Sequence, residues 1–307
     1  MTRPPKLALP LRDGVSASCI AVPAVQPSGH HTGLLIDFLV ARMPGVGYEE
    51  WLARLCRGDV LDEQGQVLPP QAQAQAGVRI YYYRQLPDEA VIPFEARILF
   101  QDELLLVADK PHFLPIMPAG RYVRETLLAR LKKSSGLATL TPIHRLDRET
   151  AGLALFSIQP ATRGVYHALF RERSVEKIYE AIAPFRPELA LPLTRCSRLQ
   201  ERADAFMQME EIAGEPNAET QITLLQRYGD LARYELRPLT GQKHQLRVHM
   251  NALGLPIEGD RIYPRLWPEQ AQPDYNEPLQ LLAREIAFTD PCTGEHRLFK
   301  TGLKLAG

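Results

Sequence analysis

The sequence predicts an α+β protein built on a mixed, largely antiparallel sheet. Three observations support this class. Short strand-like segments dominate, as in residues 176–185, where apolar and polar positions alternate. The helical segments between them are short and amphipathic. The regular strand–helix–strand alternation of a doubly wound parallel sheet is missing. With 307 residues the chain is long enough for one large domain or two ordinary ones.

The first third of the chain predicts a small module separate from the rest. Residues 1–33 are rich in proline and are expected to be extended and irregular. Residues 34–84 then give two amphipathic helices, LLIDFLVARM and YEEWLARLC, followed by the strand VRIYYYR. Residues 85–94 contain two prolines and are predicted to be a linker. Residues 95–307 would form the larger domain.

Strands and helices alternate irregularly along this larger domain. A hairpin is expected within 96–111 and a second one within 218–241, with Gly229–Asp230 at its turn. The remaining predictions are helices within 124–136, 162–175 and 242–254, a strand within 149–160, a strand at 176–185, and two strands within 279–302.

Composition and charge exclude several classes of protein. Lys+Arg and Asp+Glu both number 36, so the net charge is zero and the chain is not a polybasic binder, although a local basic groove is compatible with this balance. The four cysteines are scattered without a CxxC pair, which argues against a zinc ribbon and fits a reducing compartment. No run of 18 apolar residues is present, so no membrane span is expected. The expected location is the cytoplasm.

One polar segment stands directly before an apolar, strand-like stretch. In TPIHRLDRETAGLALFS, His144, Arg145 and Asp147 precede the stretch, and Arg145 and Arg148 flank the carboxylate. Two neighbouring guanidinium groups would keep Asp147 ionised. An ionised aspartate in a cleft can act as a nucleophile or a base. The alternative is a turn that holds a surface salt bridge.

A second polar group is predicted on the helix within residues 242–254. Lys243, Arg247 and Asn251 are spaced four apart and would share one helix face, which suits a carboxylate or phosphate partner. The alternative is a solvated basic face. His244 and His249 are separated by about 140° on a helix, so they do not converge on one metal ion.

Tyr179 lies in the strand KIYEA, on the face opposite its isoleucine neighbours. The default interpretation is a core tyrosine with a satisfied hydroxyl group. The functional alternative is an aromatic ring that stacks on a base or sugar, or that relays a proton. The chain lacks the P-loop, the GxGxxG fingerprint, the GxSxG elbow and the HExxH motif.

Taken together, five segments resemble the RluA-type pseudouridine synthases. HRLDRETAGLALF is similar to the catalytic-loop signature of that family, and KIYEA to its K-x-Y-x-A strand. GQKHQLRVHMNALGLPIEGDRIY resembles its third signature. ADKPHFLPIMPAG and LLAREIAFTDPCTGE are similar to its early and closing segments. The five occur in the family's order over roughly residues 95–302.

The resemblance implies a central RNA-binding cleft and isomerisation of uridine to pseudouridine in RNA, either ribosomal or transfer RNA, by a monomer without cofactor or metal. Asp147 matches the nucleophilic aspartate, and Arg247 the basic residue that pairs with it. Tyr179 matches the active-site tyrosine, and Arg145 the residue that occupies the helix when the target base is flipped out. His144, Lys243 and His244 are predicted to contact RNA or the base. The sequence departs from many relatives at Gln242–Lys243 and Leu282.

Residues 34–84 are similar in layout to the small S-four RNA-binding module that precedes many such domains. Their five arginines and six acidic residues give a net charge of −1, a poor charge for phosphate binding. A spacer or a docking surface is the alternative role.

Two other functions compete with the isomerase. One is a non-catalytic RNA-binding protein on the same fold. The other is a lyase or isomerase acting on a small molecule through the Asp147–Arg247 pair.

Overall fold

The computed structural model describes residues 7–23, 33–84, 89–205, 207–268 and 274–306. By compactness the chain divides into two units. Unit 1 comprises residues 1–89 and 132–138, and unit 2 comprises residues 90–131 and 139–307. The division at residue 89 falls inside the predicted linker. Residues 132–138 were expected in the larger domain but group with unit 1. Lys132 and Lys133, at the end of a helix, donate hydrogen bonds to Ser16 and Asp13 of that unit.

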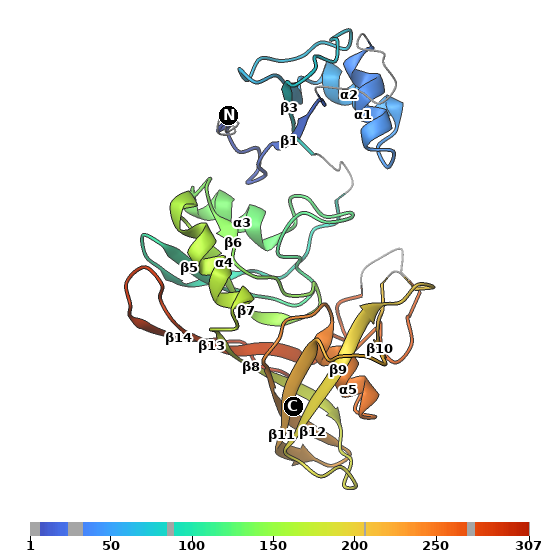
Figure 1. Cartoon of the computed structure of the whole chain (residues 1–307), viewed down its shortest axis with the longest axis vertical. Helices are drawn as coiled ribbons and strands as arrows, with labels where there is room; N and C mark the ends of the chain where they lie inside the picture. The colour runs from blue at the N-terminus through green and yellow to red at the C-terminus, as the bar shows by residue number, and fades with distance from the viewer. Residues whose placement is uncertain (1–6, 24–32, 85–88, 206, 269–273, 307) are drawn as a thin grey trace. The chain divides into compact units, whose positions relative to one another are not determined.

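The described residues of unit 1 form helices α1 and α2, the end of a third helix, and a three-stranded antiparallel sheet in the order β1-β3-β2 (Figure 1). The strand β1 lies in the segment expected to be irregular, and this expectation was wrong for its four residues, which pair with β3. The helix, helix and strand predictions for residues 34–84 are confirmed. The elements are β1 (Ser18–Ala21), α1 (Leu35–Arg42), α2 (Tyr48–Cys56), β2 (Val60–Leu61) and β3 (Arg79–Tyr82).

Apolar residues spaced three and four apart explain the two helices of unit 1. Leu35 and Leu39 of α1 and Leu55 of α2 are buried together. Trp51 of α2 is fully buried and meets the ring of Tyr82 edge-on, with 5.1 Å between ring centroids. Unit 1 therefore has a hydrophobic core of its own.

Unit 2 is built on an 11-stranded sheet whose main path runs β10-β9-β11-β12-β8-β13-β7-β5-β4, with β14 paired to β13 and β6 paired to β7 (Figure 1). Among the strand pairs of the described residues, only β7–β13 is parallel, so the mixed, largely antiparallel sheet is confirmed. The strands are β4 (Arg97–Gln101), β5 (Leu105–Lys110), β6 (Thr141–Pro142), β7 (Ala151–Ser157), β8 (Glu176–Pro184), β9 (Leu193–Glu201), β10 (Met209–Ile212), β11 (Ala218–Tyr228), β12 (Leu231–Pro238), β13 (Leu281–Thr289) and β14 (His296–Lys300).

Few helices accompany this sheet. In the described residues they are α3 (Leu127–Ser135), whose last residues belong to unit 1, the 3₁₀ turn η1 (Pro160–Thr162), α4 (Arg163–Arg171) and α5 (Gln245–Ala252). No helix in the described part of the chain is both long and apolar enough to cross a membrane.

The parallel pairing of β7 with β13 depends on a glycine. Gly152 has a φ of 113°, and a Cβ at this position would lie 2.3 Å from the carbonyl oxygen of Ala283. Only glycine allows so close an approach. The pairing fixes the start of β7, directly after the loop that carries Asp147.

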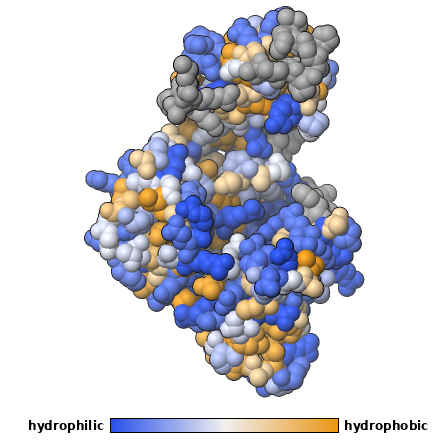
Figure 2. All heavy atoms as spheres, viewed as in Figure 1, coloured by the Kyte–Doolittle hydropathy of each residue, from blue (hydrophilic) through white to orange (hydrophobic). Residues whose placement is uncertain are grey.

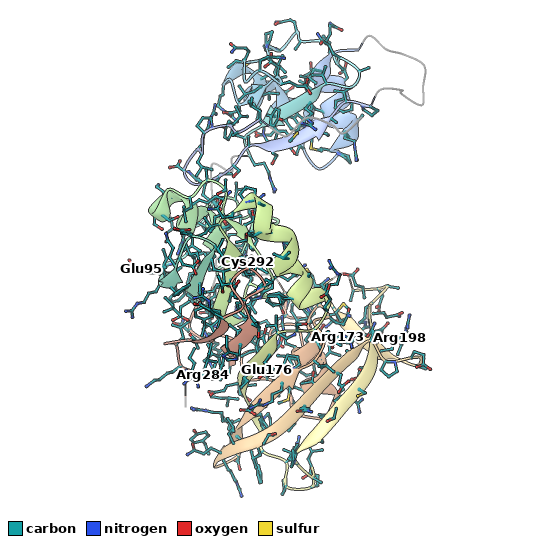
Figure 3. The ribbon with its side chains drawn as sticks, turned by 60° about the vertical axis from the view of Figure 1, so that its left-hand side comes forward. Glu95, Arg173, Glu176, Arg198, Arg284 and Cys292 are labelled. Atoms are coloured by element: carbon teal, nitrogen blue, oxygen red, sulfur yellow. The ribbon has the colours of Figure 1, made fainter. Side chains whose placement is uncertain are left out.

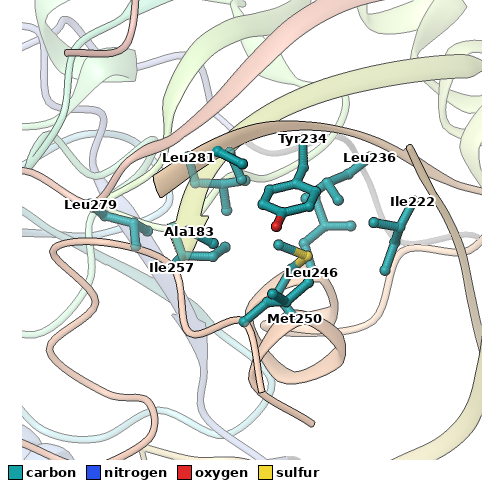
Figure 4. Close-up of a cluster of buried hydrophobic side chains, with 12 residues drawn as sticks. Ala183, Ile222, Tyr234, Leu236, Leu246, Met250, Ile257, Leu279 and Leu281 are labelled. Atoms are coloured by element: carbon teal, nitrogen blue, oxygen red, sulfur yellow. The ribbon is translucent and has the colours of Figure 1, made fainter. Parts of the chain in front are cut away.

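Helix α5 is seated on the sheet by its apolar side. Leu246 and Met250 pack against Tyr234 of β12 and Ile222 of β11 in a buried cluster that also includes residues of β8 and β13 (Figure 4). Removing this apolar surface from water stabilises one orientation of the helix. The same orientation determines where Arg247, between the two packed residues, projects.

Candidate active site

The loop that carries Asp147 joins β6 to β7 and is fixed by a buried lysine. Lys110, at the end of β5, is fully buried, and its Nζ donates to the carbonyl oxygens of Pro111, Leu114 and Arg148 at 3.0, 2.8 and 2.9 Å. Three acceptors match the three N–H groups of an ammonium. Burial lowers the pKa of Lys110 to about 7. Because Arg148 follows Asp147 directly, these bonds hold the loop in place.

Arg247 bridges two carboxylates. Its Nε and Nη2 donate to the two oxygens of Asp260 at 2.8 and 2.6 Å, and its Nη1 donates to Oδ2 of Asp147 at 3.2 Å. The side chains of Arg247 and Asp260 are each 1% exposed, whereas that of Asp147 is 18% exposed. The two-point contact fixes the guanidinium plane. Asp147 is therefore the one carboxylate of this group that a bound molecule can reach.

Asp260 is itself held by the backbone. Its Oδ1 also accepts the amide N–H groups of Ile262 and Tyr263 at 2.8 and 3.1 Å. The preceding Gly259 has a φ of 73°, and a Cβ there would lie 2.4 Å from the carbonyl oxygen of Pro278. This turn, seen in the sequence as GLPIEGD, places the carboxylate against Arg247.

Opposing effects act on the charge of Asp147. Burial raises the pKa of this carboxyl, but His244, when protonated, Arg247 and Arg145 lower it, and the pKa ends below its ordinary value. Burial would lower the pKa of Arg247, but its hydrogen bonds and charge contact with Asp260 raise it further. The site thus holds an ionised Asp147 beside a permanent cation at neutral pH.

His244 is a further neighbour of Asp147, in addition to Arg247 and Arg145. It precedes α5 in a left-handed conformation, with a φ of 54°, and its Nε2 lies 3.8 Å from Oδ2 of Asp147. Its Nδ1 is 3.0 Å from the hydroxyl of Tyr263, which accepts the amide N–H of Met209 at 2.7 Å. Burial lowers the pKa of His244, so the ring is neutral at neutral pH. The contact between Nδ1 and the Tyr263 hydroxyl orients the ring so that Nε2 faces Asp147.

Tyr179 is half-buried on β8, where it pairs with Leu236 of β12 and Ala283 of β13. Burial and the charge of Asp147 raise its pKa, so the side chain is a neutral phenol. Beside it is a cavity of about 10 Å³, the size of one water molecule, lined in part by His144 and Lys177. An uncharged ring near a carboxylate is suited to packing against an uncharged base.

His144 and Arg145 occupy different environments although they are adjacent. The His144 ring stacks on Phe170 at 4.8 Å, and its Nε2 accepts the amide N–H of Leu155 at 3.2 Å. Burial lowers its pKa to about 4. These contacts describe a side chain that anchors the loop to β7, and an RNA contact by His144 stays a prediction. Arg145, in contrast, is exposed to solvent. Its guanidinium can therefore reach a bound molecule.

The prediction of one basic helix face was wrong. Helix α5 begins at Gln245, so Lys243 lies before it and does not share a face with Arg247. Lys243 instead donates to Glu201 at 2.8 Å. The left-handed conformation of His244 turns the chain before the helix starts, and hydropathy periodicity carries no signal for such a turn.

The structure adds three residues that sequence reasoning did not single out: Lys110, Asp260 and Tyr263. All three lie inside the quoted family-like segments ADKP and GDRIY, so the signal was present there. Each also has a partner outside its own segment: Arg148 for Lys110, Arg247 for Asp260 and Met209 for Tyr263. In the described part of the chain, no three His, Cys, Asp or Glu side chains cluster as a metal site would require.

Figure 2 shows that the visible face of unit 2 is hollowed between the part bearing α3 and α4 and the part bearing β9 and β10, with a largely hydrophilic border. A hollow with a hydrophilic border is suited to a polar or charged ligand.

The chain is similar in sequence to known proteins. Residues 104–252, which include Asp147, Tyr179 and Arg247, match the family model of RNA pseudouridylate synthases. An uncharacterized RNA pseudouridine synthase of Synechocystis is 30% identical over 75% of this chain and 79% of its own length. The dual-specificity RNA pseudouridine synthase RluA of Haemophilus influenzae is 33% identical over 66% of this chain and 90% of its own length.

A solved structure points the same way. Human RNA pseudouridylate synthase domain containing 4 is 28% identical and superposes with a TM-score of 0.53, covering 68% of this chain and 88% of the human one. The resemblance noted in the five motifs is thereby confirmed over most of the chain. The protein belongs to the RluA-type family of RNA pseudouridine synthases, enzymes that isomerise uridine to pseudouridine.

Proposed function

We propose that the protein converts uridine to pseudouridine within ribosomal or transfer RNA, and that Asp147 is the residue that carries the reaction. The observation that supports this most strongly is the arrangement of its carboxylate: ionised, partly exposed, and bonded to a buried guanidinium that Asp260 fixes. A neutralising partner lowers the cost of keeping the carboxylate charged in a nearly dry site.

The reaction breaks the bond between N1 of uracil and C1′ of ribose and forms a bond between C5 and C1′. C5 loses a proton and N1 gains one, so atoms and electrons balance. The proposal therefore requires neither a cofactor nor a metal ion. The carboxylate of Asp147 supplies the electron pair, either to the sugar or to the base, and is regenerated when the new bond forms.

Access to these atoms requires the uridine to leave the helix, because C1′ and C5 are shielded in a stacked base pair. We assign the vacated space to Arg145, which is exposed next to the site. Tyr179 would pack on the flipped uracil, and His244, 3.8 Å from Asp147, would contact the bound nucleotide. Exposed Arg173, at the turn before β8, and Arg198, on β9 (Figure 3), are suited to phosphate contacts.

The proposal is tested with Asp147→Asn, which keeps the shape of the side chain and removes its charge. RNA containing uridine tritiated at C5 releases tritium when pseudouridine forms. We expect Asp147→Asn to lower this release more than about 10³-fold, as the loss of a nucleophile does, while RNA binding is retained.

Asp230→Asn, at the exposed β11–β12 turn, is the matched control and should keep full activity. An Asp147→Asn protein with parental activity would refute the assignment. Failure of the parent to release tritium from any RNA, with binding intact, would favour the non-catalytic RNA-binding alternative.

Several broader assignments accompany this proposal. We place the protein in the cytoplasm, acting as a monomer. We assign residues 34–84 of unit 1 an S-four-like layout and a subsidiary role as a spacer or docking surface, because their net charge of −1 is unfavourable for phosphate binding. Mapping pseudouridines in total RNA of a deletion strain would identify the target positions.

A further inference from the structure

Trp267 presents an indole ring to solvent seven residues after Asp260, which belongs to the candidate active site. Its exposed fraction is 58%, whereas Trp51, the other tryptophan of the chain, is fully buried in unit 1. Leaving a large aromatic surface in water is unfavourable. An exposed ring of this size next to a functional site is a candidate contact for a ligand.

The segment that carries Trp267 starts at Asp260 and folds back onto Arg261. The loop follows Asp260, which holds Arg247, and the amide N–H of Trp267 donates to the carbonyl oxygen of Arg261 at 2.8 Å. This bond closes the loop one residue from Asp260. The indole therefore stands on a segment whose first residue is part of the ion network around Asp147.

The base of the loop, Ile262 and Tyr263, is held by hydrogen bonds, whereas residues 264–268 are exposed. The carbonyl oxygen of Ile262 accepts a hydrogen bond from Gln208 at 2.7 Å, and the hydroxyl of Tyr263 accepts the amide N–H of Met209. Both Ile262 and Tyr263 are buried. A fixed base restricts the backbone of the segment that carries the ring, which limits the entropy that binding would cost.

Cationic and apolar residues precede Trp267 in the chain. Arg265 is exposed two positions before Trp267, and Leu266 between them is 44% exposed. Met207 is 50% exposed and lies two residues before Met209, whose amide N–H donates to the hydroxyl of Tyr263 in the loop. A flat ring with an adjacent guanidinium suits an unpaired nucleotide, whose base stacks and whose phosphate is anionic.

We propose that Trp267 stacks on an unpaired nucleobase next to the target uridine and that Arg265 contacts the adjoining phosphate. The inference rests on the proposed function and extends it to a substrate class, because it requires RNA in which a neighbour of the target is unpaired, as in a loop or bulge. Trp267 thus contributes to the choice of substrate and takes no part in the chemistry.

Tryptophan fluorescence of the full-length protein tests this directly, because Trp51 is buried and Trp267 is the exposed emitter. A stem-loop RNA with the target uridine in its loop should quench the emission at the same concentrations that raise fluorescence anisotropy of end-labelled RNA. Trp267→Phe should remove the quenching and keep the affinity within about threefold, since phenylalanine also stacks. Trp267→Ala should weaken binding roughly 10-fold.

The results separate this inference from the proposed function. If the RNA binds and is isomerised but the emission does not change, or if Trp267→Ala binds as tightly as the parent, the stacking contact is absent and the isomerase assignment stands. If Trp267→Ala lowers the affinity for loop RNA and for fully paired RNA by the same factor, the requirement for an unpaired neighbour is refuted. If neither RNA binds, the proposed function fails first.

Discussion

The two sides of helix α5 are buried alike and chemically opposite. Arg247, 1% exposed, bridges the carboxylates of Asp260 and Asp147. His249 lies two residues further, about 200° around the helix, and is fully buried. Its Nε2 is 3.1 Å from the hydroxyl of Ser197, and its Nδ1 is 3.0 Å from that of Thr220. One side is an ion network and the other a neutral hydrogen-bond network.

The difference shows where unit 2 retains buried charge. Burial lowers the pKa of His249 to about 4, so the ring sheds its charge rather than remain protonated. Arg247 keeps its charge because two carboxylates compensate it. The neutral side holds the helix to β9 and β11, and the charged side serves Asp147. We expect the two sides to respond differently to substitution.

The largest effect is expected from Arg247→Met. This change leaves Asp260 buried without its cation, so the free energy of unfolding should fall by about 3–5 kcal/mol. Pseudouridine formation should be lost at the same time, because the pKa of Asp147 rises without the guanidinium. Chemical denaturation and tritium release measure the two effects.

A double variant separates stability from activity on the charged side. Arg247→Met with Asp260→Asn removes both charges and keeps the amide-accepting oxygen for Ile262 and Tyr263. It should recover part of the lost stability and none of the activity. Recovery of activity in the double variant would show that the ion network serves folding alone.

An intermediate effect is expected on the neutral side. His249→Leu leaves the hydroxyls of Ser197 and Thr220 without this partner and should cost about 1–3 kcal/mol, with kcat unchanged in the folded protein. This outcome would distinguish a structural side from a catalytic side of one helix. A fall in kcat comparable to that of Arg247→Met would remove the distinction.

The pH dependence of stability sharpens this test. Between pH 6.5 and about 4 the unfolded chain protonates His249 while the folded one does not, so folding loses up to about 1.4 kcal/mol per pH unit through this group. The stability gap between the parent and His249→Leu should therefore narrow as the pH falls through this window. A gap that stays constant from pH 7 to 4.5 would contradict the neutral assignment.

The smallest effect is expected from Lys243→Ala. The partner of Lys243, Glu201, is 61% exposed, so losing this ion pair should change stability by less than about 1 kcal/mol. RNA affinity should decrease modestly, and the slope of log affinity against log salt should fall by about one phosphate contact. A large loss of kcat would instead place Lys243 in the catalytic machinery.

Local patterns predicted most of the elements. The alternation in residues 218–241 and the Gly229–Asp230 turn gave the β11–β12 hairpin, because side-chain period and turn chemistry are local properties. The strands β9 and β10 were missed, since much of β9 is exposed and its polar side chains leave little apolar periodicity. β1 was missed because four residues among prolines give too short a signal.

The sequence by itself determined the family and the identity of the chemical groups: an aspartate at 147, an arginine at 247 and a tyrosine at 179, each within a recognisable motif. Only the tertiary structure decided which of them meet and which stay apart. It put Asp260 beside Arg247, held the Asp147 loop with Lys110, turned His144 onto Phe170 and removed Lys243 from the helix. The physical reason is that burial and charge compensation depend on residues distant in the chain, which no local pattern records.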